Sequence, residues 1–317
     1  MRKISAFARL LRFPGIAALA IPPIIAALTV KNVEIDALTY IGLFIIGACS
    51  SIFGFVLNDI IDLEIDKKSK DLKKRPLVSG EISKISALMI CITCIVVAFF
   101  IMFLIWYNET LDYLKFRAVL CLVFACILGS IYDFYGKKIV GSDIFVALGV
   151  AFVFLFGAYA VGAPNIITWI VFVLTFNNLL HMNAIEGGIK DADHDPQMGV
   201  KNLAYASGVR VKGQNIVIPN IFKFFSISIR IISSVLLFLP FVIFGYNYSY
   251  PQIFILAIGT IIMILLSMKL ISIKKFERNE IRKMISAQSF LRYSLVPIML
   301  FSIIGPVISL ILIFLPL

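Results

Sequence analysis

Charged residues are scarce in this chain. Only 15% of its 317 residues are Asp, Glu, Lys or Arg, whereas 61% are hydrophobic. This balance excludes an ordinary soluble globular protein and is typical of an integral membrane protein. Long polar stretches are also missing, and none of those present is long enough to form a hydrophobic core of its own. The sequence therefore predicts a single membrane domain over residues 1–317.

Histidine and cysteine are rare, which limits the metal chemistry open to the chain. It has two His and five Cys. All five cysteines fall in apolar runs, and the pair Cys91 and Cys94 has no second pair or histidine cluster to complete a zinc site. Ordinary buried packing is the favoured interpretation of these thiols.

Long apolar runs dominate the chain instead. A helix needs about 20 mainly apolar residues to cross a bilayer core of about 30 Å. Nine runs approach this condition: 14–30, 38–57, 84–105, 116–132, 142–162, 165–183, 222–245, 251–271 and 290–315. They predict an all-α integral membrane protein, with about nine transmembrane helices in one bundle around a central cavity.

The basic residues predict how the helices are oriented. If the chain begins in the cytoplasm, nine crossings leave only Lys31, Lys115 and Arg117 on the outer side, and 26 of the 29 basic residues inside. This follows the positive-inside rule. The net charge of +11 is thereby explained by topology and by anionic lipid headgroups, without nucleic acid. We expect a multi-pass cell-membrane protein whose long loops 58–83 and 184–221 form a cytoplasmic cap.

Three oxygen-bearing side chains follow the second apolar run at a spacing of four residues. They are Asn58, Asp62 and Asp66. On a helix, steps of four residues drift by only about 40° each, so the three groups share one face. Oxygen ligands on one face, at the end of a membrane helix, indicate a site for a cation.

A second acidic segment, 191–195, follows another long apolar run. Two like charges about 5 Å apart repel by about 3 kcal/mol at an effective dielectric constant near 20, so converging carboxylates require protons or cations. Oxygen ligands without a Cys or His cluster favour Mg²⁺, which binds through few carboxylates together with substrate phosphates. We infer one Mg²⁺ site for a diphosphate, shared by Asp62, Asp66, Asp191 and Asp195.

Other acidic residues in these segments fit simpler interpretations. Asp59 and Asp193 could be partners of the metal ligands. The remaining four fit a solvated loop balanced by neighbouring lysines: Glu64, Asp71, Glu81 and Glu186.

Basic and aromatic residues near the first cluster are candidates for substrate contacts. Arg75 could clamp a diphosphate, because a guanidinium pairs with phosphate oxygens in two parallel hydrogen bonds. At the end of the fourth apolar run, the ring of Tyr132 could stabilise an allylic cation, and Lys137 or Lys138 could pair with phosphate. The alternatives are a solvated basic loop, an interfacial aromatic residue and a topogenic lysine pair.

Together these motifs resemble the UbiA-type intramembrane prenyltransferase superfamily. The resemblance covers nearly the whole chain, including the helix count. It is carried by Asn58-x-x-x-Asp62-x-x-x-Asp66, Arg75-Pro76-Leu77-x-x-Gly80, Tyr132 with Lys137, and Asp191-x-x-x-Asp195 with Gly199. The chain departs from the family after the second motif, where Val200–Ala204 takes the place of a Thr-Leu-Pro-like element.

The resemblance implies a transferase of quinone or lipid biosynthesis. It would transfer a prenyl group from a polyprenyl diphosphate to a lipophilic acceptor, such as an aromatic quinone precursor or a glyceryl phosphate lipid. Mg²⁺ is the implied cofactor. Its implied ligands are Asn58, Asp62, Asp66, Asp191 and Asp195, while Arg75 and Lys137 would hold phosphate oxygens. The four aspartates and Tyr132 are the candidate catalytic residues.

Two other classes of protein remain open. A membrane transporter with inverted repeats is suggested by the recurrence of an acidic cluster about 130 residues later and by Asn177, Asn178 and His181 in the weakest apolar run. Transport sites usually lie near the bilayer midplane, whereas these acids follow the ends of apolar runs. A non-catalytic lipid-binding scaffold is the third class.

Overall fold

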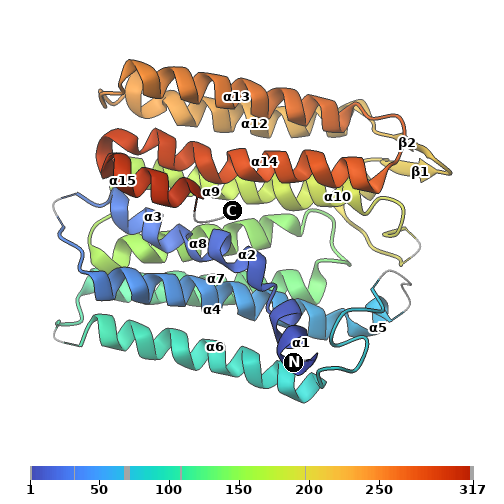
Figure 1. The fold of residues 1–317 in the computed structure, drawn as a ribbon, viewed down its shortest axis with the longest axis horizontal. Helices are drawn as coiled ribbons and strands as arrows, with labels where there is room; N and C mark the ends of the chain where they lie inside the picture. The colour runs from blue at the N-terminus through green and yellow to red at the C-terminus, as the bar shows by residue number, and fades with distance from the viewer. Residues whose placement is uncertain (1, 32, 68–71, 108, 197, 315–317) are drawn as a thin grey trace. The chain divides into compact units, whose positions relative to one another are not determined.

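Helices make up nearly all of the regular structure (Figure 1). The computed structural model describes residues 2–31, 33–67, 72–107, 109–196 and 198–314. An apolar chain in a bilayer favours helices because each helix satisfies its own backbone hydrogen bonds. Within the described residues, seven helices are long and apolar enough to cross a membrane, or eight if one bent pair within residues 4–29 counts as a span.

Seven of the nine predicted spans coincide with these seven helices. The other two fall on interrupted helices. The run 14–30 divides into α2 (Phe13–Ala20) and α3 (Pro22–Thr29), where two prolines begin the second helix. The run 290–315 falls across the end of α14 (Arg278–Met299) and α15 (Phe301–Phe314), and Gly305 in α15 has a φ of 79°, which is non-helical.

The chain divides into two compact units, and each is described by itself. The first comprises residues 1–134 and 152–164. Besides α2 and α3 it contains α1 (Arg2–Leu10), α4 (Ala37–Ile61), α5 (Leu63–Asp66), α6 (Lys84–Ile105), nearly all of α7 (Tyr113–Tyr135) and the second part of α8 (Asp143–Val161).

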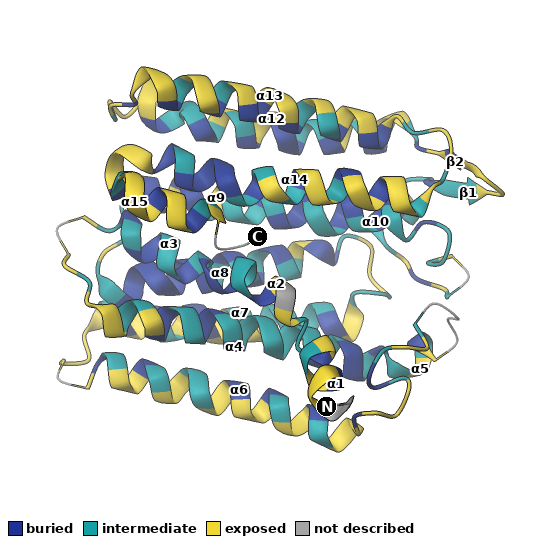
Figure 2. Cartoon of the chain, in the orientation of Figure 1, coloured by how far each residue is buried: buried dark blue, intermediate teal, exposed yellow. Residues whose placement is uncertain are grey.

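Helix α4 is the centre of the first unit, where it packs against α2, α3 and α6. A Cβ built on Gly47 of α4 would lie 2.4 Å from the carbonyl oxygen of Ala20, so this crossing needs a glycine. On α6, large apolar side chains face outward, among them Ile85 at 76% exposed and Val96 at 60%. Figure 2 shows this exposed surface along α6, as expected of a lipid-facing helix.

The second unit comprises residues 135–151 and 165–317. Besides the first part of α8, its helices are α9 (Ile166–Leu180), the π-helix η1 (His181–Gly187), α10 (Gly188–Lys190), α11 (Leu203–Ala206), α12 (Asn220–Val242), α13 (Tyr250–Ile271), α14 and α15. Helices α9, η1 and α10 form one continuous span, Ile166–Lys190, longer than the predicted 165–183.

The long loop before α12 has structure of its own. It contains α11 and a short antiparallel hairpin, β1 (Arg210–Lys212) with β2 (Asn215–Val217), in which Arg210 pairs with Val217. The hairpin lies beside the connection from α13 to α14, because Ile216 N donates to Lys274 O at 3.0 Å. Buried Val209, Ile216 and Phe222 then join Ile189 in one hydrophobic cluster. The hairpin is a small departure from the all-α prediction.

Candidate functional site

The first acidic cluster consists of Asn58, Asp59, Asp62, Asp66 and Asp133. Asp62 N donates to Asn58 O at 2.9 Å, and Asp66 N donates to Asp62 O at 2.8 Å. These i to i−4 bonds continue the helical path from α4 into α5, although α4 formally ends at Ile61. The spacing of four therefore places Asn58, Asp62 and Asp66 on successive turns, as predicted.

Two arginines accompany the buried carboxylates of this cluster. Asp62 is 5% exposed and Asp66 is 3% exposed. Arg75 Nη1 lies 2.6 Å from Asp66 Oδ2 and 3.3 Å from Asp59 Oδ1, and Arg12 Nη2 lies 3.1 Å from the same Asp59 oxygen. The two arginine side chains remain 35% and 40% exposed. Solvent and ligands can therefore reach the guanidiniums from outside.

A hydrophobic anchor positions the loop that carries Arg75. Leu77 and Ile82 are buried in one cluster with Leu10 of α1 and Val56 of α4. Ile82 N donates to Pro76 O at 3.1 Å, which closes the loop just after Arg75. The apolar residues that follow Arg75 thus hold this loop against the helices that carry the acids.

Asp133, near the end of α7, belongs to this cluster but was missed by sequence reasoning. Asn58 Nδ2 donates to Asp133 Oδ1 at 3.3 Å, and Asp133 is only 8% exposed. Its other oxygen, Oδ2, is buried without a hydrogen-bond partner in the described part of the chain. The available signal was an acid directly after an apolar run, on the same predicted side as Asn58. Tyr132, a predicted catalytic residue, precedes it and is half-buried.

The second acidic cluster consists of Asp191, Asp193 and Asp195, in the second unit. It begins where α10 ends, and Asp195 N donates to Asp191 O at 3.0 Å, so the two predicted ligands lie one turn apart. Both are half-buried. Lys190 Nζ lies 3.2 Å from Asp191 Oδ2, and Asn202 donates to the carboxylate of Asp195.

Lys137 belongs to the surroundings of the second cluster. Its carbonyl accepts a hydrogen bond from Lys201 N at 2.9 Å, which ties the segment after α7 to the loop after Asp195. Burial, and next the charge of Asp191, raise the pKa of the Asp195 carboxyl to about 7, while the charge of Lys137 acts in the opposite direction. A carboxyl group with this pKa readily accepts either a proton or a cation near neutral pH.

The predicted site residues thus form two groups. Asn58, Asp62, Asp66 and Arg75 come together in the first unit, and Tyr132 lies beside Asp133 in sequence. Asp191, Asp195 and Lys137 come together in the second unit. That the two groups share one cation and one diphosphate stays a prediction.

The oxygen atoms of the first cluster are of the kind that binds Mg²⁺. Within the described ranges, no three His, Cys, Asp or Glu side chains form a ready-made metal cluster. Mg²⁺ does not require one, because it is usually bound by one or two carboxylates, waters and substrate phosphates. The first cluster offers carboxylate and amide oxygens, and among the described residues no donor reaches the buried Asp133 Oδ2. These features fit a hard divalent cation.

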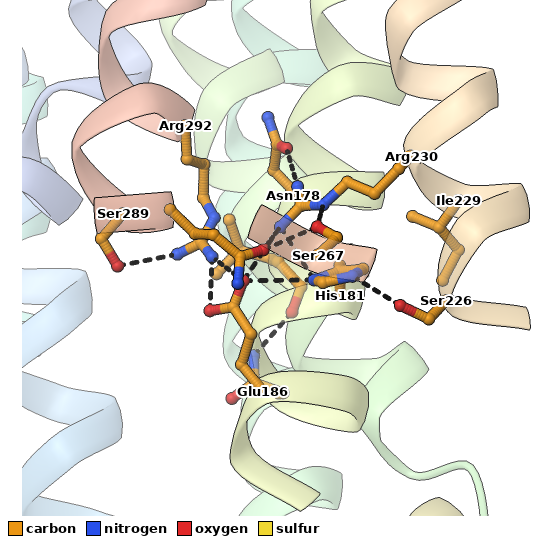
Figure 3. A network of polar contacts seen from close by, with 12 residues as sticks. Asn178, His181, Glu186, Ser226, Ile229, Arg230, Ser267, Ser289 and Arg292 are labelled. Carbon is orange, nitrogen blue, oxygen red and sulfur yellow. Dashed lines mark hydrogen bonds and ion pairs between the residues drawn. The ribbon is translucent and has the colours of Figure 1, made fainter. Parts of the chain in front are cut away.

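A third polar group, which we call the Glu186 network, lies inside the second unit (Figure 3). Glu186 is 1% exposed, and both of its oxygens lie 2.5 Å from Arg292 Nη2, with Arg230 Nη2 at 2.9 Å. The interpretation of Glu186 as a solvated loop residue is therefore wrong. The network also includes three further buried side chains: His181, Gln288 and Ser267.

Hydrogen bonding determines the charge of His181. Arg230 Nη2 lies 2.9 Å from His181 Nδ1, and a guanidinium can only donate. Nδ1 also lies 3.2 Å from Glu186 Oε1, but the guanidinium is closer and cannot accept. Nδ1 therefore accepts from Arg230, and the ring proton lies on Nε2, which donates to Ser226 Oγ at 3.0 Å. His181 is thus neutral, and the network contains one negative and two positive side chains.

The Glu186 network holds the segment that leads to the second acidic cluster. Glu186 lies in η1, five residues before Asp191, and π-helical turns often occur at functional sites. The available sequence signal was Arg230 and Arg292, each a charge inside an apolar run, since such charges require partners in a membrane.

Apolar helices long enough to span a membrane, with acidic clusters following two of them, are the features of a polytopic membrane protein. The sequence matches the UbiA prenyltransferase family over residues 19–295. The chain belongs to this family.

Curated relatives include enzymes named 4-hydroxybenzoate octaprenyltransferase. The protein from Francisella tularensis subsp. mediasiatica (strain FSC147) is 27% identical over 194 residues, which cover 60% of this chain and 64% of the relative. The protein from Pseudoalteromonas translucida (strain TAC 125) is 29% identical over 183 residues, which cover 57% and 60%. The chain thus spans just under two thirds of the length of these relatives.

Solved structures share the fold over nearly the whole chain. A structure described as digeranylgeranylglyceryl phosphate synthase in membranes has a TM-score of 0.69 at 22% identity and covers 96% of this chain and 99% of its own. A UbiA homologue from Archaeoglobus fulgidus bound to GPP and Mg²⁺ has a TM-score of 0.66 at 19% identity and covers 94% and 99%.

Proposed function

We propose that this protein is an intramembrane prenyltransferase. It transfers a prenyl group from a polyprenyl diphosphate to a lipophilic acceptor, such as an aromatic quinone precursor or a glyceryl phosphate lipid, and it requires Mg²⁺. The observation that carries the proposal is the first acidic cluster, where buried carboxylates meet two partly exposed guanidiniums at the end of an apolar helix. Both signs of charge are needed to bind a diphosphate together with a divalent cation.

The ligand assignment follows the two acidic motifs. The residues proposed to hold Mg²⁺ are Asn58, Asp62, Asp66, Asp191 and Asp195. When bound, Mg²⁺ neutralises charge on the diphosphate and makes it a better leaving group. The Archaeoglobus homologue bound to GPP and Mg²⁺ supports this choice of cation and donor.

Arg75 and Lys137 are proposed to hold the diphosphate. Arg75 pairs with Asp66 and Asp59 through Nη1, and its 35% exposed side chain can exchange these partners for phosphate oxygens. Lys137 supplies a second positive charge near Asp195. These two positive side chains act most strongly on the negative charge that develops as the diphosphate leaves.

The reaction breaks the bond between the allylic carbon and the diphosphate oxygen, and diphosphate leaves with the electron pair. The ring of Tyr132 stabilises the positive charge that develops on the allylic carbon. A nucleophilic carbon or oxygen of the acceptor then bonds to that carbon and loses a proton. The apolar helices exclude water, which would otherwise capture the cation.

The remaining parts of the proposal concern the membrane topology and the position of the active site. We infer a single membrane domain with nine crossings, in which the two interrupted helices count as spans. The active site lies on the cytoplasmic side beneath a cap of the two long loops, because the loops on that side carry most of the basic residues and the outer side has only Lys31, Lys115 and Arg117. The bilayer supplies the isoprenoid substrates, and nucleic acid has no part.

The test is transfer of a labelled prenyl group in membranes that contain Asp62→Asn or Asp191→Asn. Each variant is expected to lose at least about a hundredfold in rate, because each removes charge stabilisation from the leaving group. Glu64→Gln is the matched control, since Glu64 lies on α5 but its side chain is 79% exposed and pairs with Lys67.

An acceptor panel analysed by mass spectrometry would identify the product class. It should include 4-hydroxybenzoate, for which the curated relatives are named, and a geranylgeranylglyceryl phosphate, because one solved neighbour is named as a synthase of the digeranylgeranyl compound. Turnover like that of the wild type in both aspartate variants would refute the assignment. Substrate flux in proteoliposomes without any prenylated product would favour the transporter instead.

A further inference from the structure

A small cavity lies inside the second unit beside the Glu186 network. Its volume is about 20 Å³, slightly above the roughly 10–15 Å³ that one water molecule needs. Helices α9, α12, α13 and α14 each contribute lining residues. The polar lining includes Asn178, Arg230, Ser233, Thr260 and Arg292.

The side chains around this cavity carry an excess of positive charge. Arg230 is 1% exposed and Arg292 is 3% exposed. In the described contacts of these two guanidiniums, Glu186 is the one acidic partner, and His181 is neutral because its Nδ1 accepts from Arg230. One positive charge is therefore left without a counter-charge, and a buried charge is costly unless it is paired.

Two hydrogen-bond donors of the lining have no partner. Arg292 Nε and Thr260 Oγ1 are both buried without a hydrogen bond in the described part of the chain. The nearby serines are already satisfied, because Ser233 Oγ donates to Ile229 O at 2.8 Å and Ser234 Oγ donates to Arg230 O at 2.7 Å. The two unpaired donors, Arg292 Nε and Thr260 Oγ1, are therefore available to a ligand in the cavity.

We propose that this cavity binds a single monatomic anion of chloride size, held by Arg292 Nε, the Thr260 hydroxyl and the charge of Arg230. Such an anion satisfies both orphan donors and balances the excess charge. A water molecule satisfies the donors but leaves the charge unbalanced. A volume of about 20 Å³ suits a monatomic anion better than a phosphate or an organic carboxylate. The site is separate from both acidic clusters and does not rest on the proposed enzymatic activity.

The test uses purified protein in detergent, equilibrated with sodium gluconate and titrated with sodium chloride at constant ionic strength. A ligand that binds only the folded state raises the melting temperature in a saturable way. We expect such a rise with chloride and with bromide. Crystals grown in bromide should show an anomalous scattering peak in the cavity, beside Arg292 and Thr260.

A pair of variants assigns the effect to this site. Thr260→Val removes the orphan hydroxyl at nearly constant volume, and it should weaken the chloride affinity by about tenfold or more, since a hydrogen bond to an ion is lost. The control is Thr175→Val on α9, because Thr175 donates to Val171 O at 2.8 Å and does not line the cavity. It should retain the wild-type chloride affinity.

Three outcomes would overturn the proposal. One is a melting temperature of the wild type that does not depend on chloride. The second is a water molecule, with no bromide peak, in the cavity. The third is a Thr260→Val variant that binds chloride as tightly as Thr175→Val.

Discussion

The first acidic cluster and the Glu186 network are built from the same chemistry, a carboxylate with two arginines, but they differ in exposure. At Asp59 and Asp66, the arginine side chains are 35–40% exposed. At Glu186, both arginine side chains are 1% exposed. A pair that water reaches can exchange its partners, whereas a sealed pair is fixed, because separating buried charges is costly. Exposure therefore distinguishes the cluster proposed to bind the substrate from the network that holds the helices of the second unit together.

The largest change in stability should follow from a substitution in the Glu186 network. Glu186→Gln leaves two buried arginines without an acid, and we expect the free energy of unfolding to fall by about 3–5 kcal/mol. Unfolding in detergent, followed by circular dichroism, measures the change. The double variant Glu186→Gln with Arg292→Met should be less destabilised than the single variant, because it removes a charge of each sign. Equal destabilisation would mean that the charges are not what matters.

A substitution in the first acidic cluster should change the activity more than the stability. Arg75→Gln is expected to lower the prenyl transfer rate by about a hundredfold, since one donor to the developing charge is lost. The change in unfolding free energy should stay near 1 kcal/mol or below, as for other partly exposed pairs. Arg9→Gln is the control, because Arg9 of α1 pairs with Glu81 and donates to Lys74 O of the same loop, but contacts no acid of the first cluster in the described structure. A large loss of stability with normal activity would mean that Arg75 has a structural role, like the arginines of the Glu186 network.

A smaller effect is expected at the edge of the exposed cluster. Asp133→Asn keeps an oxygen for the amide of Asn58 and replaces a buried carboxyl group whose second oxygen has no described partner. We expect the protein without metal or substrate to become more stable by about 1 kcal/mol. Thermal unfolding in EDTA checks this expectation. A loss of stability would show that the carboxylate has a donor or cation of its own in that state.

The sequence predicted most of the spans and the local geometry of the first cluster. Uninterrupted apolar runs with polar ends define their own helices, as in α4 and α6. The runs that contain Pro22 and Pro23, or Gly305 and Pro306, broke where backbone chemistry interrupts a helix. Likewise, the spacing of Asn58, Asp62 and Asp66 is a local property of one helical path, so it could be predicted without knowledge of the fold.

Contacts between distant segments could not be predicted in this way. Glu186 resembles a loop acid in sequence, because the residues that bury it, Arg230 and Arg292, are 44 and 106 positions away. Asp133 is 75 positions from Asn58. Their pairing depends on which helices pack together, and apolar runs of similar composition carry little information about their neighbours.

The most direct test of the central claim is a structure with Mn²⁺ and a non-reactive prenyl thiodiphosphate. Our account predicts that carboxylates from both clusters, Asp62 and Asp191 among them, coordinate divalent ions bound to the same diphosphate, with Arg75 turned from Asp66 to the phosphate oxygens. A diphosphate contacted by one cluster alone, with the other still bound only to protein side chains, would contradict it.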